Sequence, residues 1–199
     1  MVEASSGGYP VVLTVADNNK VANWRPLAHW LLVIPHYIIN YVLQIVSQVL
    51  AVVCWFIIVI TGKLPEGLAN FQIMYMRYST RMTGFLLGMT EDYPPFTFDS
   101  VAQDPGDYAI GLTVVPELED RNRLTVALRL LWMIPAAIVT AVFSIIAMIV
   151  SLVAWFAVLF TGTYPEGMRN VMIGVGRNVA RLSAYVLLLT DEYPPFSLD

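Results

Sequence analysis

Two long apolar stretches decide the fold of this chain. The first, residues 31–62, reads LLVIPHYIINYVLQIVSQVLAVVCWFIIVITG, and the second, residues 131–162, reads LWMIPAAIVTAVFSIIAMIVSLVAWFAVLFTG. A helix of about 20 apolar residues spans a bilayer. Both stretches exceed that length, and neither contains Asp, Glu, Lys or Arg. Each therefore predicts a membrane helix, with Pro35 or Pro135 marking a kink or the first helical turn near its start.

The composition also favours contact with lipid. Of the 199 residues, 57% are hydrophobic and only 13% are charged, whereas soluble domains carry about 25% charged residues. The polar residues are too few to cover a soluble protein of this size. The formal net charge is −4 and no basic run occurs, which argues against a nucleic-acid partner. Residues 1–30 lack a charged start followed by an apolar run, so we expect the first membrane helix to act as the insertion signal.

The chain contains an internal duplication. Shifted by 100 positions, Trp55 falls on Trp155 and the motifs around it coincide, and the stretches that open the two copies match with Leu13 on Leu112. This predicts two tandem units, residues 1–99 and 100–199. The motif positions kept in both copies are Pro65, Glu66, Gly67, Tyr93, Pro94, Pro95 and Phe96 in the first unit and Pro165, Glu166, Gly167, Tyr193, Pro194, Pro195 and Phe196 in the second.

Each unit is expected to contain two strands and two helices. An alternating stretch opens the unit as a short strand, and the apolar helix follows after a polar turn. A Thr-Gly pair ends that helix, because glycine suits the position just past a helix end. A second helix carries two arginines, and a second strand begins in the YPPF motif. The expected bounds are 9–15, 96–98, 108–115 and 196–198 for the strands, 27–60 and 124–160 for the apolar helices, and 68–89 and 168–189 for the arginine-bearing helices.

The arginine-bearing helices offer the sharpest candidate site. Arg77 and Arg81 lie four residues apart and therefore share one helical face, as do Arg177 and Arg181. No acidic residue occurs inside the apolar stretches to neutralise these charges. One interpretation is a site for anionic groups, such as lipid phosphates or a carboxylate, between the units. The alternative is structural, with the guanidinium groups capping backbone carbonyls or reaching to lipid headgroups.

Two membrane topologies follow from these helices. If the arginine-bearing helices cross the bilayer, the chain crosses four times, the units lie parallel, and the strands and both termini share one side. That side would hold Lys20, Arg25, Arg121 and Arg123, so the positive-inside rule places the termini in the cytoplasm. If those helices lie on the surface, there are two crossings and the units are inverted. Each arginine would cost about 2.5–3.5 kcal/mol at the bilayer centre. We predict four crossings of the cell membrane, in a mainly α-helical protein with a small cytoplasmic β layer.

The histidines are the only candidate ligands for a haem or a metal. His29 and His36 lie seven residues apart on one face near the membrane boundary, but the second unit has Arg129 and Ala136 at these positions. No nucleophile–base–acid set, phosphate loop or nucleotide-binding motif is visible either. We therefore predict no cofactor, no metal and no enzymatic activity.

The ordered set of motifs resembles one known family. A strand, the step Ile34-Pro35-His36, an apolar run ending in Thr-Gly and Pro-Glu-Gly, an arginine-bearing helix and a terminal YPPF motif are typical of the bacterial and archaeal membrane family called domain of unknown function 4389. Both units match, so the resemblance covers nearly the whole chain, although Ala136 replaces the histidine in the second unit. The resemblance implies a membrane protein and no established activity.

Small size and the lack of a catalytic set predict a non-enzymatic accessory or scaffold subunit of a larger membrane complex, or a lipid-binding protein. Its expected partners are membrane lipids, including anionic ones, and other membrane proteins or a second copy of the chain. Two alternatives remain open. One is a small transporter or lipid-handling protein with an anionic-ligand site at the repeat interface. The other is a subunit of an electron-transfer complex.

Overall fold

The computed structural model describes residues 8–198 and is mainly helical, with one small sheet. The two opening strands and both helices of each unit form where the sequence predicts them. In chain order the elements are β1 (Val11–Val15), α1 (Arg25–Leu32), α2 (Ile34–Thr61), α3 (Glu66–Leu86), β2 (Ile110–Val114), α4 (Arg123–Ala127), α5 (Arg129–Thr161) and α6 (Glu166–Val186).

Proline and glycine set the ends of the two long helices. Val33 separates α1 from α2, and Pro35 occupies the first turn of α2, where its missing N–H has no helical partner to lose. In the second unit α5 instead runs through Pro135. Both long helices end at a glycine in the left-handed conformation, Gly62 with φ of 73° and Gly162 with φ of 67°, a geometry that glycine adopts without steric cost.

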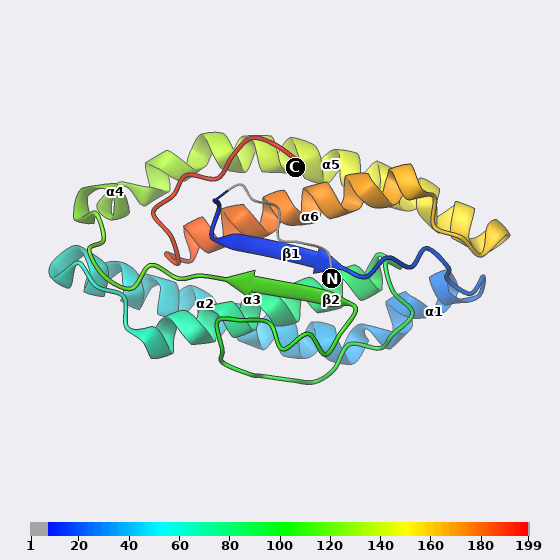
Figure 1. Ribbon diagram of the computed structural model, residues 1–199, viewed down its shortest axis with the longest axis horizontal. Coiled ribbons are helices and arrows are strands. Elements are labelled where there is room, and N and C mark those ends of the chain that lie inside the picture. Colours follow the sequence, from blue (N-terminus) through cyan, green and yellow to red (C-terminus); the bar gives the residue numbers. More distant parts are fainter. Residues whose placement is uncertain (1–7, 199) are drawn as a thin grey trace.

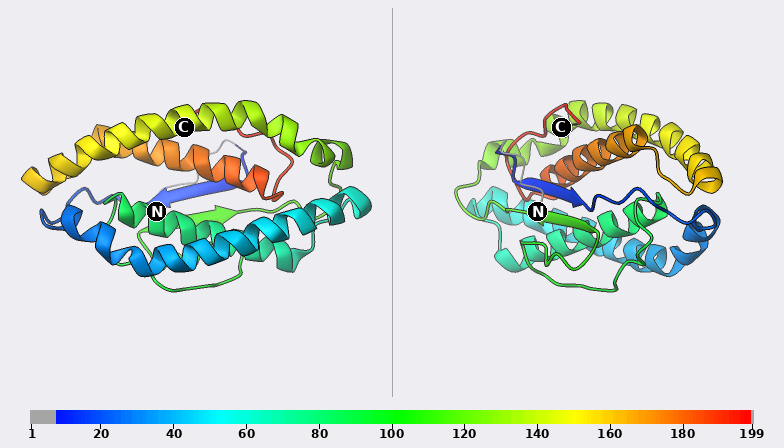
Figure 2. Two further views of the ribbon diagram at one scale, coloured as in Figure 1. Left: turned by 180° about the vertical axis from the view of Figure 1, so that it is seen from behind. Right: turned by 45° about the vertical axis from the view of Figure 1, so that its right-hand side comes forward.

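The elements stack in three layers (Figure 1, Figure 2). The view from behind in Figure 2 shows α2 and α5 nearest the viewer, as the rear layer of Figure 1, with α3 and α6 beyond them. The strands β1 and β2 and the connecting segments form the front layer. Helix α2 packs on α3, and α5 packs on α6. The inward faces of the strands, including Leu13 and Leu112, are buried against the helices.

A pseudo-two-fold axis through the sheet relates the two units. Strands β1 and β2 pair antiparallel, and Leu13 lies opposite Leu112 at the centre of the pairing. These two leucines occupy equivalent positions of the repeat, so every other pair in the ladder has a symmetry-related pair on the far side of them. The strands therefore fix how the units sit against each other.

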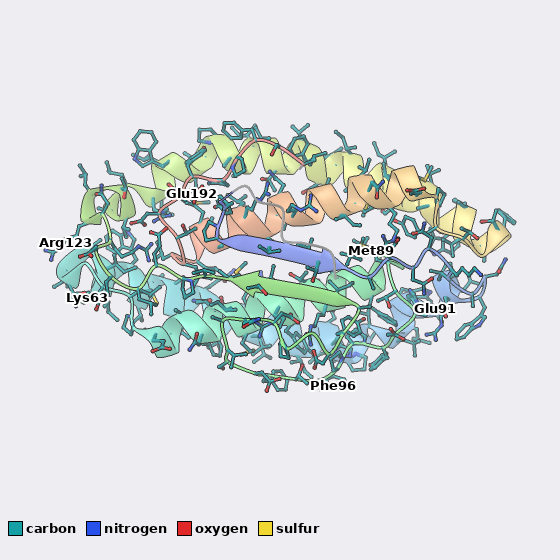
Figure 3. All side chains as sticks on the ribbon, in the orientation of Figure 1. Lys63, Met89, Glu91, Phe96, Arg123 and Glu192 are labelled. Carbon is teal, nitrogen blue, oxygen red and sulfur yellow. The ribbon has the colours of Figure 1, made fainter. Side chains whose placement is uncertain are left out.

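Because of this axis, α2 and α5 run in opposite directions. The N–H of Arg121 donates to the carbonyl of Gly62 at 3.0 Å, and the N–H of Val21 donates to the carbonyl of Gly162 at 3.1 Å. The end of each long helix thus meets the start of the other unit. Figure 3 shows Lys63 beside Arg123 at one end of the molecule and Glu91 at the other. The predicted parallel arrangement of the units is wrong, because an antiparallel sheet joins them.

The strands are exchanged between the units. Strand β1 of the first unit packs on α6, and β2 of the second unit packs on α3. The hydroxyl of Tyr9 donates to the carbonyl of Glu192 at 3.1 Å, and the hydroxyl of Tyr108 donates to the carbonyl of Asp92 at 2.7 Å. Each unit therefore completes the other, although the sequence divides them at residue 99.

The second strand predicted in each unit does not form in the described residues. Residues 96–98 and 196–198 have irregular backbone, because the tandem prolines before them remove backbone donors and favour an isolated extended chain. Side chains hold these segments instead. The ring of Phe96 stacks on His36 with centroids 4.0 Å apart, and the hydroxyl of Tyr93 donates to the carbonyl of Leu32 at 3.1 Å.

Candidate functional site

Arg77 and Arg81 lie on the face of α3 that contacts the segment between the repeats, and both are buried. Nε of Arg77 lies 3.0 Å from Oδ2 of Asp104, and Nη2 of Arg81 lies 3.2 Å from Oδ1 of the same carboxylate. Arg81 also lies 2.7 Å from the carboxylate of Asp107. The guanidinium of Arg77 donates further to backbone carbonyls, those of Asp99, Val101, Ala102 and Leu112.

Arg177 and Arg181 hold the equivalent positions on α6. Arg177 donates to the carbonyl of Leu198 at 3.2 Å. Arg181 lies over the ring of Tyr9 at 5.6 Å, just as Arg81 lies over Tyr108 at 5.5 Å. Each arginine pair thus contacts the opening strand of the other unit and the segment after its own YPPF motif. The two pairs contact different residues and are not brought together into one site.

This geometry bears on the anionic site expected at these arginines. The donors of Arg77 and Arg81 already face Asp104, Asp107 and backbone carbonyls, so a ligand there would have to displace a carboxylate. The expectation of uncompensated charge overlooked acids outside the apolar stretches. Residues 99–107 contain three aspartates and no basic residue, which was the available signal. The contacts of Arg77 and Arg177 match the structural interpretation, in which the guanidinium groups cap carbonyls, whereas Arg81 pairs with carboxylates.

A second charge cluster joins the end of α6 to the start of α4 and α5. Nη2 of Arg121 lies 2.6 Å from Oδ1 of Asp191, and Arg129 pairs with the same oxygen. The guanidinium of Arg129 lies 3.9 Å from the ring centre of Tyr185. Burial raises the pKa of Asp191, but the hydrogen bond and charge of Arg121, with Arg129 and the N–H of Asn122, outweigh burial and hold that pKa below its ordinary value. The Asp191 carboxylate therefore links the segment after α6 to the start of α4 and α5.

The long helices turn polar or small side chains toward the protein and large apolar side chains toward the outside. The buried positions of α2 are His36, Asn40, Ser47, Cys54 and Ile58, and those of α5 from Ala136 onward are Ala136, Thr140, Ala147, Ala154 and Val158. The opposite faces expose large apolar side chains along their length, among them Ile38, Val42, Ile45, Val49, Val52, Phe56, Ile138, Val142, Ile145, Ile149, Leu152 and Phe156. Among the described residues, α2 and α5 are the two helices long and apolar enough to cross a membrane.

The buried polar groups of these helices bind the arginine-bearing helices. The hydroxyl of Ser47 donates to the side chain of Gln72, whose Nε2 donates to the Ser47 carbonyl at 2.9 Å. In the second unit the hydroxyl of Thr140 lies 2.7 Å from Oδ1 of Asn178. Such bonds fix the register of each helix pair.

The histidines lie in different surroundings. Nδ1 of His36 lies 2.8 Å from the hydroxyl of Tyr78, within the aromatic cluster of the first YPPF motif. The ring of His29 instead packs against that of Phe85 in a tilted arrangement, with ring centroids 4.2 Å apart. Within residues 8–198, no group of three or more His, Cys, Asp or Glu side chains could hold a metal ion.

The Pro-Glu-Gly motifs start the arginine-bearing helices. Pro65 and Pro165 cap α3 and α6 in an extended conformation, and Glu66 and Glu166 occupy the first turns. A carboxylate there favours the positive end of the helix dipole.

Comparison with known proteins agrees with this repeat structure. No curated protein matches the chain, and no solved structure matches it. A family model described as domain of unknown function (DUF4389) matches residues 23–97 and again residues 123–197. These ranges cover the helices and the YPPF motif of both units. The chain therefore belongs to the DUF4389 family and carries two copies of its domain.

Proposed function

We propose that this protein is a non-enzymatic integral membrane protein that embeds α2 and α5 in lipid and serves as an accessory or scaffold component of a larger membrane complex. The observation that carries the proposal is the exposed apolar face that runs along both α2 and α5. The protein-facing side of α2 contains His36, Asn40 and Ser47 and that of α5 mainly small residues, whereas the large exposed side chains of both helices are mostly aliphatic and aromatic.

In water this arrangement would be unfavourable. Each Å² of apolar surface left exposed costs about 25 cal/mol, and soluble monomers rarely expose an apolar patch beyond a few hundred Å². Side chains such as Ile38, Leu152 and Phe160 are each more than half exposed on helices of 28 and 33 residues. Lipid is the solvent that suits such faces.

The layered fold supports a flat placement of α2 and α5 along the membrane plane. The sheet and the irregular segment 90–109 run beside the helices rather than beyond their ends (Figure 1). If α2 stood upright, this irregular backbone and the exposed carboxylate of Asp107 would lie at bilayer depth, and lipid-exposed irregular backbone is not tolerated there. Flat placement puts the rear layer in lipid and the front layer in water.

The YPPF motifs offer a surface for a protein partner. Phe96 is 48% exposed and its symmetry equivalent Phe196 is 55% exposed, although each ring contacts aromatic neighbours. Exposed aromatic side chains held rigidly are typical anchors at protein interfaces. We propose that these two rings contact the other components of the complex.

Membrane embedding is tested by charge insertion. Val49→Glu in α2 and Leu152→Glu in α5 place a carboxylate on the proposed lipid face, and we expect the double variant to leave the alkali-washed membrane fraction. Thr14→Glu, on the exposed face of the sheet, is the control and should stay in that fraction. Unchanged membrane retention of the double variant would overturn the proposal.

Orientation is tested by cysteine labelling. Cys54→Ala copies Ala154 of the other unit and removes the only thiol. Single cysteines at Asp17 and Lys63, at opposite ends of α2, are then treated with a membrane-impermeant maleimide. Labelling of both from the same side is expected for flat placement. Labelling from opposite sides would show that α2 crosses the bilayer.

The accessory role is tested by purification from the source membrane in mild detergent, followed by mass spectrometry. A stoichiometric complex that is lost in the Phe96→Ala, Phe196→Ala double variant is the expected result. If the wild-type chain purifies alone, the accessory role is wrong.

A further inference from the structure

A groove of about 340 Å³ lies behind the sheet, where the two units meet. The inner face of the sheet, with Leu13 and Ile110, forms its floor, and α3, α6 and one flank of α2 form its walls. Because the sheet closes the front, the groove opens toward the rear layer. Seen from behind, α6 and the strands are visible between α5 and α2 (Figure 2). The groove is therefore reached from the side proposed to face lipid.

Two glutamine amides from α2 line this groove, Gln44 and Gln48. On the same helix Ser47 bonds to α3, whereas Ile45 and Val49 are exposed on the outer side. Gln44 and Gln48 are one turn apart and lie on the flank between these two sides. Both are exposed, and neither amide has a hydrogen-bond partner among the described residues.

Helix α3 adds hydroxyl groups to the same groove. Tyr75 and Ser79 line it and are hydrogen-bonded to each other, and Thr80 and the exposed Thr83 lie further along the helix. No Asp, Glu, Lys, Arg or His is found among the described residues that line the groove. The groove thus offers uncharged donors and acceptors above an apolar floor.

The second unit shows that the fold does not require these polar groups. Most of the equivalent positions are apolar there, since Gln48, Tyr75 and Ser79 correspond to Met148, Val175 and Val179. Ser144 replaces Gln44, and its hydroxyl donates to the carbonyl of Thr140 at 2.8 Å, within its own helix. A polar group placed in an apolar environment without a hydrogen bond is unfavourable. The polar lining of the first unit therefore indicates a ligand that bonds to it.

We propose that this groove binds one membrane lipid whose headgroup is uncharged and carries hydroxyl groups. The headgroup bonds to Gln44, Gln48 and the hydroxyls of α3, and the acyl chains lie along the exposed apolar side of α2. A charged phosphate headgroup would find no counter-charge in the lining. The inference rests on the proposed embedding of α2 in lipid, and it is independent of the accessory role.

The size of the groove favours a lipid headgroup over the helix of a partner protein. Small-molecule sites have volumes of about 300–1,000 Å³, and this groove falls within that range. One turn of a helix about 10 Å wide and about 5.4 Å high occupies about 400 Å³. The groove would therefore hold less than one helical turn.

The test uses the full chain purified in a polyoxyethylene detergent, because the sugar headgroup of a maltoside would itself compete for the groove. Monogalactosyl diacylglycerol is the probe, and phosphatidylcholine with the same acyl chains is the comparison lipid. Native mass spectrometry counts the bound lipid per chain during titration. We expect saturable binding of one galactolipid per chain, at concentrations where phosphatidylcholine does not bind.

The variants copy the second unit. The double variant Gln44→Ser, Gln48→Met installs the residues that α5 carries, and Ser79→Val installs that of α6. Each is expected to weaken galactolipid binding about tenfold, as the loss of one or two hydrogen bonds implies. Gln103→Met changes an exposed glutamine outside the groove, so this control should bind as the wild type does.

Two further readouts separate lipid binding from folding and from membrane embedding. The variants should keep the unfolding midpoint of the lipid-free wild type, because the same residues are accommodated in the second unit. If the wild type stays in alkali-washed membranes but binds no galactolipid, this inference fails alone and embedding stands. Equal binding by the wild type and both variants, equal binding of the two lipids, or cross-linking of a photoreactive group at position 44 to a protein partner instead of lipid would refute the lipid site.

Discussion

Leu13 in β1 and Leu112 in β2 lie directly opposite each other in the sheet, although they are the same position of the two repeats. This pairing places the pseudo-two-fold axis between them. Contacts away from the axis therefore occur twice, as the bonds from Tyr9 to Glu192 and from Tyr108 to Asp92 do. Where symmetry-related positions carry different residues, the two units differ in their local contacts.

Asp104 neutralises two buried arginines of the first unit. Asp104→Asn would leave Arg77 and Arg81 with a single partly exposed carboxylate, that of Asp107. Removing one partner of a buried ion pair costs about 3–5 kcal/mol. We expect Asp104→Asn to lower the free energy of unfolding by an amount in this range, measured by denaturant titration in detergent.

Asp107→Asn is the control for that experiment. The Asp107 side chain is 41% exposed, and partly exposed ion pairs contribute about 0–1 kcal/mol. Equal effects of the two substitutions would contradict the central role given to Asp104.

Gly84 allows α3 to approach β2 closely. A Cβ atom there would lie 2.1 Å from Cδ1 of Ile110, so the strand or the side chain would have to shift. We expect Gly84→Ala to destabilise the protein by about 1–3 kcal/mol, the usual cost of overpacking. The measurement is the thermal unfolding midpoint.

Gly67→Ala is the control, because it makes the same substitution in α3 at a position where the added Cβ atom would contact no other residue. No atom lies within 4 Å of a Cβ at Gly67, and alanine favours a helix over glycine. Gly67→Ala should therefore leave stability unchanged or slightly higher. A similar loss in both variants would show that contact with Ile110 does not decide the effect.

Local patterns predicted the elements well, and the arrangement of the elements poorly. The apolar stretches, the Thr-Gly ends and the opening strands follow from residues next to one another, so β1, α2 and α3 form near their predicted bounds. The antiparallel course of α2 and α5 depends on strands that pair across about 100 residues. The sequence was interpreted with each strand packed in its own unit, so the packing of β1 on α6 and of β2 on α3 was not predicted.

The arginines show the same limit at the candidate site. Their shared helical face was predictable from the spacing, and the contacts favour the capping interpretation. Their carboxylate partner was not predictable, because Asp104 lies in an irregular segment without periodicity.

Asp191 predicts a loss of stability at acid pH. Its pKa in the folded protein lies below its ordinary value of 3.8, so the unfolded chain binds the proton more tightly. The stabilisation by Arg121 and Arg129 is complete above the ordinary value and is lost as the pH falls through the lower, folded value. We expect the temperature of the thermal unfolding midpoint to decrease once the pH is lowered below about 4.

The matched variant for the acid effect is Asp191→Asn. It should be less stable than the wild type at pH 7 and should lose the part of the pH dependence that Asp191 contributes. If its midpoint falls with acid as steeply as that of the wild type, other carboxylates control acid unfolding.

The exchanged strands predict how a single unit behaves. A fragment of residues 8–107 keeps β1, α2, α3 and Asp104 but loses β2, which covers α3. Because Leu13 lies on the pseudo-two-fold axis, the β1 strand of a second copy can take the place of β2. We therefore expect this fragment to form a homodimer in detergent, measured by light scattering. Leu13→Lys should leave it as an unfolded monomer, because the charge would be buried at the centre of the new sheet. A folded, monomeric fragment would show that the unit does not need a strand from its neighbour.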